Sequence, residues 1–193
     1  MADISITATD KRRAAASGQP ASEAAPAGEP YFDLIELLFF AYRDFVGDPD
    51  EVLAKLGFGR AHHRVLHFVN RNPGMKVADL LDVLKITKQS LGRVLKQLID
   101  EGYVVQKEGA RDRRQRLLYV SPAGEALALK LAGLQTARIS RVLAELGPGA
   151  REAARRFLAG MIDAEDRAHV LRLIARADSL VERERAGARD DNP

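Results

Sequence analysis

The middle of the chain contains a succession of elements that few small folds accommodate. The residues VADLLDVL at 77–84 predict a short helix, and a longer helix, TKQSLGRVLKQLIDE, is predicted two residues later at 87–101. Two short apolar runs at 103–106 and 116–120 then flank a polar loop, as the two strands of a hairpin do. We therefore expect two helices joined by a tight turn and followed by a hairpin.

The second helix of this pair has two chemically distinct faces. Thr87 stands where a hydroxyl caps the free N–H groups of a first turn, and Gly102 stands where a left-handed residue ends a last turn. One face of the helix is apolar and consists of Leu91, Val94, Leu95, Leu98 and Ile99. The opposite face consists of Lys88, Gln89, Gly92, Arg93 and Lys96. A cationic, amide-bearing face with a glycine at its middle is suited to close approach to another molecule.

Positive charge is concentrated in this region. The segment 85–116 contains nine cations and four anions, whereas the formal net charge of the whole chain is only +3. Five of the nine cations lie in KEGARDRRQR at 107–116, around the predicted hairpin loop. A charged loop alone would be an ordinary solubilising turn, but the cationic face of the preceding helix favours a nucleic-acid-binding surface.

Two helices, a tight turn and a hairpin form the layout of a winged helix-turn-helix DNA-binding domain. The major groove admits one α-helix whose side chains pair with base edges, and the hairpin loop can place arginine in the minor groove. The expected fold class is mainly α (α+β), a winged helix-turn-helix with flanking dimerisation helices. The residues expected to contact DNA are Thr87, Lys88, Gln89, Ser90, Arg93, Lys96, Arg111, Asp112, Arg113 and Arg114.

The segment from about Gly59 to Leu127 resembles the MarR family of bacterial transcription regulators. The resemblance lies in VADLLDVLKITKQSLGRVLKQLIDEGYV and in RDRRQRLLYVSPAGEAL, which contains the Asp-x-Arg of the family's wing at Asp112 and Arg114. The resemblance implies that Asp112 holds Arg114 by an ion pair while Arg114 enters the minor groove. The sequence VSPAG at 120–124 departs mildly from the L-T-x-x-G of the family.

Both flanks of the DNA-binding region are expected to be helical, as the resemblance also implies. We expect dimerisation helices within 30–59 and 122–185 and the DNA-binding region at 60–121. Residues 1–29 predict a flexible tail, because they are rich in Ala, Ser, Gly and Pro and contain no aromatic residue. A second disordered tail is expected at 186–193.

The first flanking helix, YFDLIELLFFAYRDFV, is apolar on most of its circumference, which indicates burial against a second subunit. It is predicted to end at Gly47-Asp48-Pro49. Ser121 and Pro122 are expected to begin a long helix, and a last helix is expected from about Ala150 to Glu184. The predicted dimer interface uses Leu34, Leu38 and Phe39 together with residues near Phe157, Met161 and Ile174.

Three of the four histidines lie in HHRVLH at 62–67. His63 and His67 share a helix face at a spacing that can hold zinc, but no nearby Cys, Asp or Glu completes a ligand set, so no metal site is predicted. The resemblance implies instead a crevice that binds small aromatic acids or phenols, where Arg60 or Arg64 could meet a carboxylate. The residues predicted to line this crevice are Tyr42, His62, His63 and His67.

The absence of cysteine excludes thiolate metal sites, a nucleophilic cysteine and cysteine-based peroxide sensing. No nucleophile elbow, phosphate-binding glycine loop or zinc-hydrolase motif occurs, so neither an enzyme nor a cofactor is predicted. No apolar run is long enough to span a membrane, and we expect a cytoplasmic protein without a membrane partner.

The function predicted from these features is that of a homodimeric regulator of transcription. It would bind double-stranded DNA sequence-specifically at a pseudo-palindromic operator and respond to a small aromatic or phenolic effector. One alternative is a winged-helix module whose basic face binds an acidic protein, and a weaker one is an enzyme with an unrecognised histidine site. The sequence leaves open the operator, the target genes, the effector and the choice between repression and activation.

Overall fold

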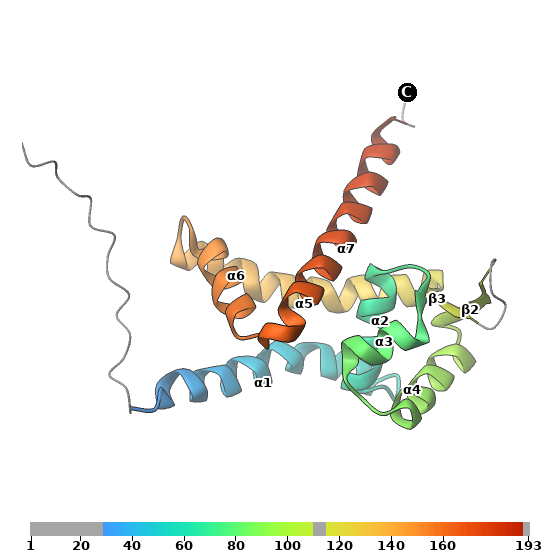
Figure 1. Cartoon of the computed structure of the whole chain (residues 1–193), viewed down its shortest axis with the longest axis horizontal. Coiled ribbons are helices and arrows are strands. Elements are labelled where there is room, and N and C mark those ends of the chain that lie inside the picture. The colour runs from blue at the N-terminus through green and yellow to red at the C-terminus, as the bar shows by residue number, and fades with distance from the viewer. Residues whose placement is uncertain (1–28, 110–114, 191–193) are drawn as a thin grey trace, which may run out of the picture.

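The computed structural model describes residues 29–109 and 115–190. Within them, the structure contains seven helices and a small antiparallel sheet, which lies at one end of the molecule (Figure 1). The helices are α1 (Phe32–Ala54), α2 (Arg60–Arg71), α3 (Val77–Leu84), α4 (Lys88–Asp100), α5 (Pro122–Leu146), α6 (Ala150–Gly160) and α7 (Ala164–Asp190). The strands are β1 (Met75–Lys76), β2 (Val104–Glu108) and β3 (Arg116–Val120). Except for Glu29, the predicted tail at 1–29 lies outside the described residues.

The predicted winged helix-turn-helix is confirmed. It is built from α2, α3, α4 and the sheet around one hydrophobic core. Leu66 of α2, Leu80 of α3, Leu91 of α4 and Leu118 of β3 are fully buried in that core. Lys85 makes the turn between α3 and α4 with a left-handed backbone, at φ 50°. Because its apolar face is held by the core, α4 presents its opposite face to solvent.

The sheet has the strand order β1-β3-β2, and both strand pairs are antiparallel. The strands β2 and β3 form the predicted hairpin, with Val104 opposite Val120 at its open end and Glu108 opposite Arg116 beside the loop. The strand β1 adds a third member, with Met75 opposite Leu118. The sequence does not predict β1, because two residues are too few to show the alternation of a strand.

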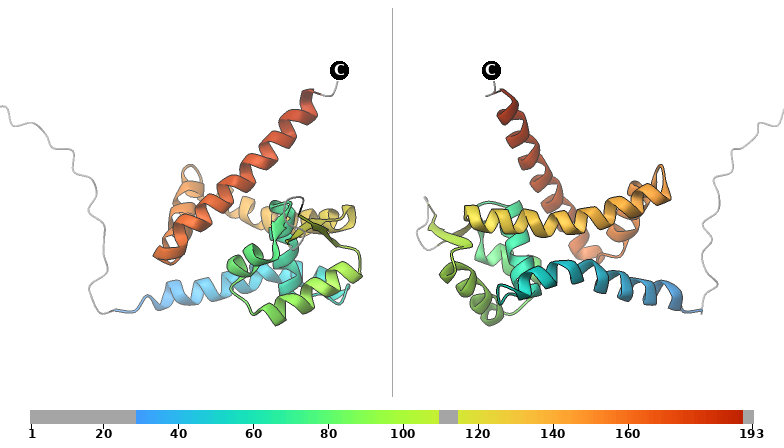
Figure 2. Two further views of the ribbon diagram at one scale, coloured as in Figure 1. Left: turned by 45° about the vertical axis from the view of Figure 1, so that its right-hand side comes forward. Right: turned by 180° about the vertical axis from the view of Figure 1, so that it is seen from behind.

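The prediction that the first helix ends at Gly47-Asp48-Pro49 is wrong, because α1 continues through Pro49 to Ala54. Val46, Pro49 and Leu53 share one face of α1 and are all buried. Burial of these three side chains outweighs the backbone hydrogen bond that proline removes from a helix. As a result α1 reaches from the far end of the molecule into the DNA-binding region (Figure 2).

The prediction of one last helix from Ala150 to Glu184 is also wrong. The helix α6 ends at Gly160, and α7 begins at Ala164 and continues to Asp190, into the tail predicted at 186–193. Arg167 stabilises the break, since its guanidinium donates hydrogen bonds to the carbonyl oxygens of Gly160 at 2.8 Å and Ile162 at 2.9 Å. These bonds occupy carbonyl groups that the end of a helix leaves without partners.

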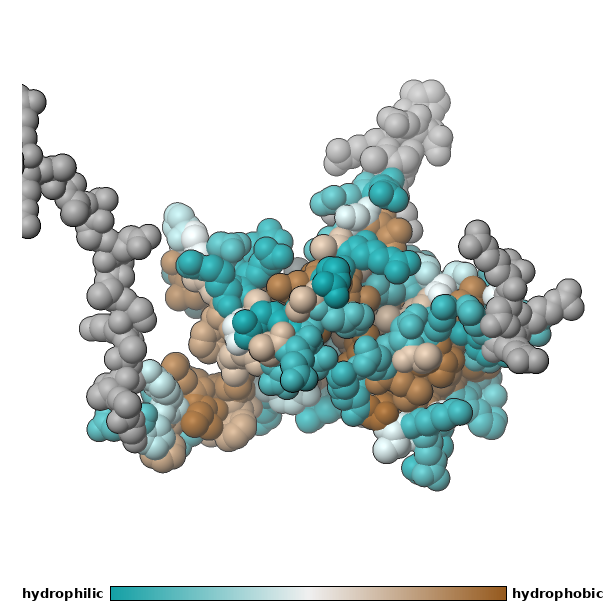
Figure 3. Space-filling model, in the orientation of Figure 1, coloured by the Kyte–Doolittle hydropathy of each residue, from teal (hydrophilic) through white to brown (hydrophobic). Residues whose placement is uncertain are grey.

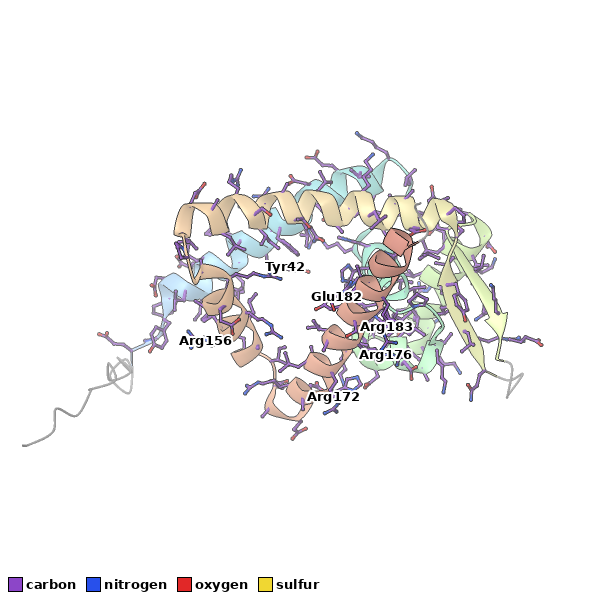
Figure 4. All side chains as sticks on the ribbon, turned by 90° about the horizontal axis from the view of Figure 1, so that it is seen from above. Tyr42, Arg156, Arg172, Arg176, Glu182 and Arg183 are labelled. Carbon is purple, nitrogen blue, oxygen red and sulfur yellow. The ribbon has the colours of Figure 1, made fainter. Side chains whose placement is uncertain are left out.

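The helix α7 turns back from α6 and passes beside the DNA-binding region, with Arg172 and Arg176 along its length (Figure 4). Its C-terminal end points away from that region (Figure 1). Leu173 packs against the hydrophobic core and Ala177 is buried. At the same seam Asp166 lies 3.4 Å from the Nζ of Lys85, the residue that makes the turn before α4. No helix of the described residues is both long and apolar enough to cross a membrane.

Candidate nucleic-acid interface

The first turn of α4 is fixed by Thr87, as the sequence predicts. The Oγ1 of Thr87 accepts a hydrogen bond from the backbone N–H of Ser90 at 3.1 Å, and its hydroxyl donates to the Oγ of Ser90 at 2.9 Å. Both residues belong to the predicted DNA-binding set. In the free protein their side chains bind each other and so set the direction in which α4 begins.

The polar face of α4 is exposed along the whole helix. Lys88, Gln89 and Arg93 are solvent-exposed and come from its first two turns. Lys96 is also exposed and forms an ion pair with Asp100, four residues further on. An exposed pair of this kind contributes about 0–1 kcal/mol, so a phosphate group can displace Asp100. Four of the predicted contact residues are thus placed on one accessible surface.

His62 of α2 connects that helix to α4 through a side-chain hydrogen bond. Its Nδ1 accepts the backbone N–H of Gly59 at 3.1 Å, so the ring proton belongs on Nε2, which donates to the Oε1 of Gln97 at 2.9 Å. The ring also stacks on Phe58 with centroids 4.8 Å apart. His62 therefore connects the start of α2 with α4, and it is not among the residues that line the cavity between α1, α2 and α5.

The wing is the hairpin of β2 and β3. Toward its loop end, the Nζ of Lys107 lies 4.9 Å from the ring centroid of Tyr119, and Arg116 forms a 2.9 Å ion pair with Glu108. These two cations of the basic segment therefore have partners within the hairpin. The tip at 110–114, with the predicted contacts Arg111, Asp112, Arg113 and Arg114, lies outside the described residues.

The corner between β3 and α5 is held by Ser121 and Gly124. The hydroxyl of Ser121 donates to the carbonyl oxygen of Gly102 at 2.6 Å and accepts the N–H of Gly124 at 3.1 Å. A Cβ on Gly124 would lie 2.0 Å from the carbonyl oxygen of Tyr103, a distance that no side chain permits. The predicted Ser121 cap is confirmed, and glycine at 124 is required by this close crossing of two chain segments.

A second candidate site is a cavity of about 240 Å³ between α1, α2 and α5. It includes three of the four predicted ligand residues, Tyr42, His63 and His67. The remaining lining residues are Phe45, Val46, Arg64, Phe68 and Gln135. The sequence gives no signal for Gln135, because only the packing of α5 on α2 brings it near the histidines.

The two cavity histidines favour their neutral forms. Burial lowers the pKa of His63, an effect that the nearby Asp50 carboxylate partly opposes. Burial likewise lowers the pKa of His67, and the neighbouring His63 and Arg71 lower it further. Arg64 is then the permanent cation of the cavity. No three His, Asp or Glu side chains within the described parts of the chain lie close enough together to hold a metal ion.

Comparison with known proteins agrees with the winged-helix fold described above. The sequence profile of the MarR family matches residues 56–115, which include α2, α3, α4 and the strands β1 and β2. The chain is 43% identical over 157 residues to the HTH-type transcriptional regulator PetP of Rhodobacter capsulatus, and the match covers 77% of this chain and 95% of PetP. The chain belongs to the MarR family. It is a MarR-family transcriptional regulator with a winged-helix DNA-binding fold.

Solved structures of other proteins have the same fold. FabT of Streptococcus pneumoniae, solved in complex with DNA, matches with a TM-score of 0.61 at 13% identity over 68% of this chain and 94% of FabT. NadR, solved in complex with 4-hydroxyphenylacetate, matches with a TM-score of 0.59 at 18% identity over 73% of this chain and 99% of NadR. At these identities the likeness establishes the shared fold.

Proposed function

We propose that this MarR-family regulator acts in the cytoplasm as a homodimer that binds a pseudo-palindromic operator sequence-specifically. The observation that carries the proposal is the orientation of α4, whose apolar face is buried while Lys88, Gln89 and Arg93 point to solvent. In a two-fold dimer, two such helices would enter major grooves about one helical turn apart. The two wings would then reach minor grooves beside them. The DNA complex of FabT, which shares the fold, supports this reading.

The dimer part of the proposal rests on the apolar surface of α1. Phe39 is 68% exposed and Leu38 is 41% exposed, and hydrophobic residues gather over α1 in Figure 3. A groove of about 300 Å³ is lined by residues of α1 together with Phe157 and Met161 at the end of α6. A continuous apolar surface of this kind marks a protein interface. A second copy of the chain is the occupant that a two-fold operator requires.

The effector part of the proposal rests on the cavity that contains His63 and His67. Its walls include the rings of Tyr42, Phe45 and Phe68, and its cation is Arg64. Aromatic walls with one guanidinium suit a small aromatic carboxylate or phenolate, and NadR with 4-hydroxyphenylacetate offers a precedent in the fold. An effector would act only by binding the DNA-competent and DNA-incompetent forms of the dimer with unequal affinity.

Selection of bound duplexes from genomic fragments tests the DNA-binding proposal directly. The expected result is a shared inverted repeat that binds one dimer per site and competes well against random duplex. Because phosphate neutralisation releases counterions, the affinity should also fall steeply with salt concentration. If duplexes of all sequences bind alike while an acidic protein is bound tightly and stoichiometrically, the protein-interaction alternative is correct.

The effector proposal has its own test. Titration of the operator complex with 4-hydroxyphenylacetate or salicylate, chosen as probes of aromatic acids, should change DNA affinity in the wild type. The change should be lost in Arg64→Ala, which removes the only permanent cation among the cavity-lining residues of the described structure. Arg60→Ala serves as the matched control, since Arg60 is a cation of the same helix that pairs with Asp50 at 2.7 Å and is not among the residues that line the cavity.

A further inference from the structure

Gly92 is a glycine in the interior of α4, on the exposed face of that helix. Glycine in a helix interior is less stable than alanine by about 1 kcal/mol, because it orders a freer backbone. Gly92 therefore lowers the stability of α4, the helix that is proposed to contact the DNA bases. Such a cost is offset where the absence of a side chain lets a neighbouring group come close, either inside the subunit or from outside it.

Within a subunit, glycine is required where the backbone has a positive φ or where a Cβ would collide with a neighbouring segment. Neither condition holds at Gly92. The glycines with positive φ are Gly57, Gly74, Gly102, Gly147 and Gly149 among the described residues, whereas Gly92 lies within a regular α-helix. A Cβ at Gly92 would meet no atom of the described residues within 4 Å, outside its own stretch of helix. Gly124 is the contrasting case, where a Cβ would collide with Tyr103. The missing Cβ of Gly92 is thus of no use within the subunit.

The surface around Gly92 is hollowed. A shallow depression of about 260 Å³ lies between α4 and β2, and its lining residues are Gly92, Leu95, Lys96, Ile99, Asp100 and Gln106. Gly92 lies one helical turn after Lys88 and Gln89, on the same side of the helix. A molecule that binds in this depression would contact the helix backbone at Gly92, the ammonium group of Lys96 and the side-chain amide of Gln106.

We propose that Gly92 is a DNA-contact position, at which the wall of the major groove comes within van der Waals distance of the α4 backbone. The inference rests on the proposed DNA-binding function and adds to it the depth at which the recognition helix is seated. A side chain at 92 would hold α4 away from the groove and so weaken the contacts of Gln89 and Arg93 as well. Residue 92 would then limit affinity through its size and not through any hydrogen bond.

Substitution by alanine tests the proposal through two effects of opposite sign. Gly92→Ala should raise the melting temperature, because alanine favours the helix, yet lower operator affinity by about tenfold, as overpacking of a tight contact does. Gly133→Ala is the matched control. Gly133 is also exposed inside a long helix, α5, with no atom of the described chain near its Cβ, so its substitution should raise the melting temperature and leave operator affinity unchanged.

The possible outcomes separate the inference from the function on which it depends. Equal operator affinity of Gly92→Ala and wild type would overturn the close approach while leaving the DNA-binding proposal intact. An equal loss of affinity in both glycine variants would also overturn it, since the effect would then come from helix stability. A wild-type protein that binds no duplex sequence-specifically would instead overturn the proposed function itself.

Discussion

The Nε2 of His62 donates a 2.9 Å hydrogen bond to the Oε1 of Gln97, and through this bond the start of α2 supports the recognition helix. Replacing His62 by alanine removes this bond, the acceptor for the N–H of Gly59 and the ring stacked on Phe58. We expect the free energy of unfolding to fall by about 1–2 kcal/mol, measured by urea denaturation. A double-mutant cycle with Gln97→Ala should show a coupling energy between the two residues. Strictly additive losses would mean that the bond does not form in solution.

Reading of the DNA sequence is expected from Gln89 and Arg93. Both are exposed on α4, and loss of one good base contact costs about 1–3 kcal/mol and relaxes the preference at one base pair. Affinities of Gln89→Ala and Arg93→Ala for the operator and for single-base variants of it provide the measurement. A uniform weakening of all duplexes would instead assign these two side chains to the phosphate backbone.

The wing is expected to contribute through Arg114, in the segment outside the described residues. Arg114→Ala should weaken operator binding and make the affinity less dependent on salt, because fewer counterions are released. Circular dichroism provides the check that the variant remains folded. An unaltered affinity in a folded Arg114→Ala protein would remove this residue from the interface.

Assembly is expected to depend on Phe39, which is 68% exposed on α1. Phe39→Asp should produce monomers at micromolar concentration in sedimentation experiments, since a carboxylate would have to be buried in the interface. Val105→Asp is the control, because Val105 is an exposed apolar residue on β2, away from α1. If Phe39→Asp sediments as the wild type does, the apolar face of α1 is not the dimer interface.

Stability is expected to fall in acid because of His63 and His67. Burial lowers the pKa of both groups in the folded protein, whereas the unfolded chain has ordinary values of about 6.5. The unfolded state therefore binds more protons as the pH falls below about 7, and the free energy of unfolding decreases. His67→Gln should lose less stability than the wild type between pH 7.5 and pH 5.5 in urea denaturation. An equal or greater loss in the variant would contradict this assignment.

Features fixed by neighbouring residues could be predicted from the sequence. Thr87 and Ser121 cap their helices because a hydroxyl reaches an N–H three residues away, and both caps are confirmed. Two short apolar runs on either side of a charged loop likewise predict the hairpin, which is confirmed. These signals depend on short spacings and are independent of the rest of the fold.

Features that depend on packing between distant segments could not be predicted. The continuation of α1 through Pro49 depends on a core that α1 meets only in the folded chain. The orientation of His62 depends on Gln97, which is 35 residues away, so a helical projection of α2 alone does not separate His62 from His63 and His67. The lining of the cavity by Gln135 has the same origin.

The crossing of Gly124 over Tyr103 has a mechanical consequence. Because not even a methyl group would fit between the two segments, the wing and α5 are in direct contact, and we expect them to move together as one lever. In the proposed dimer, the separation of the two wings is then governed by the length and mutual inclination of the α5 helices. Adding a residue within α5 would rotate the wing by about 100° about the helix axis, so it would change which operator spacing fits. Adding one at Gly147-Pro148-Gly149, beyond the far end of that lever, would leave the spacing as it was.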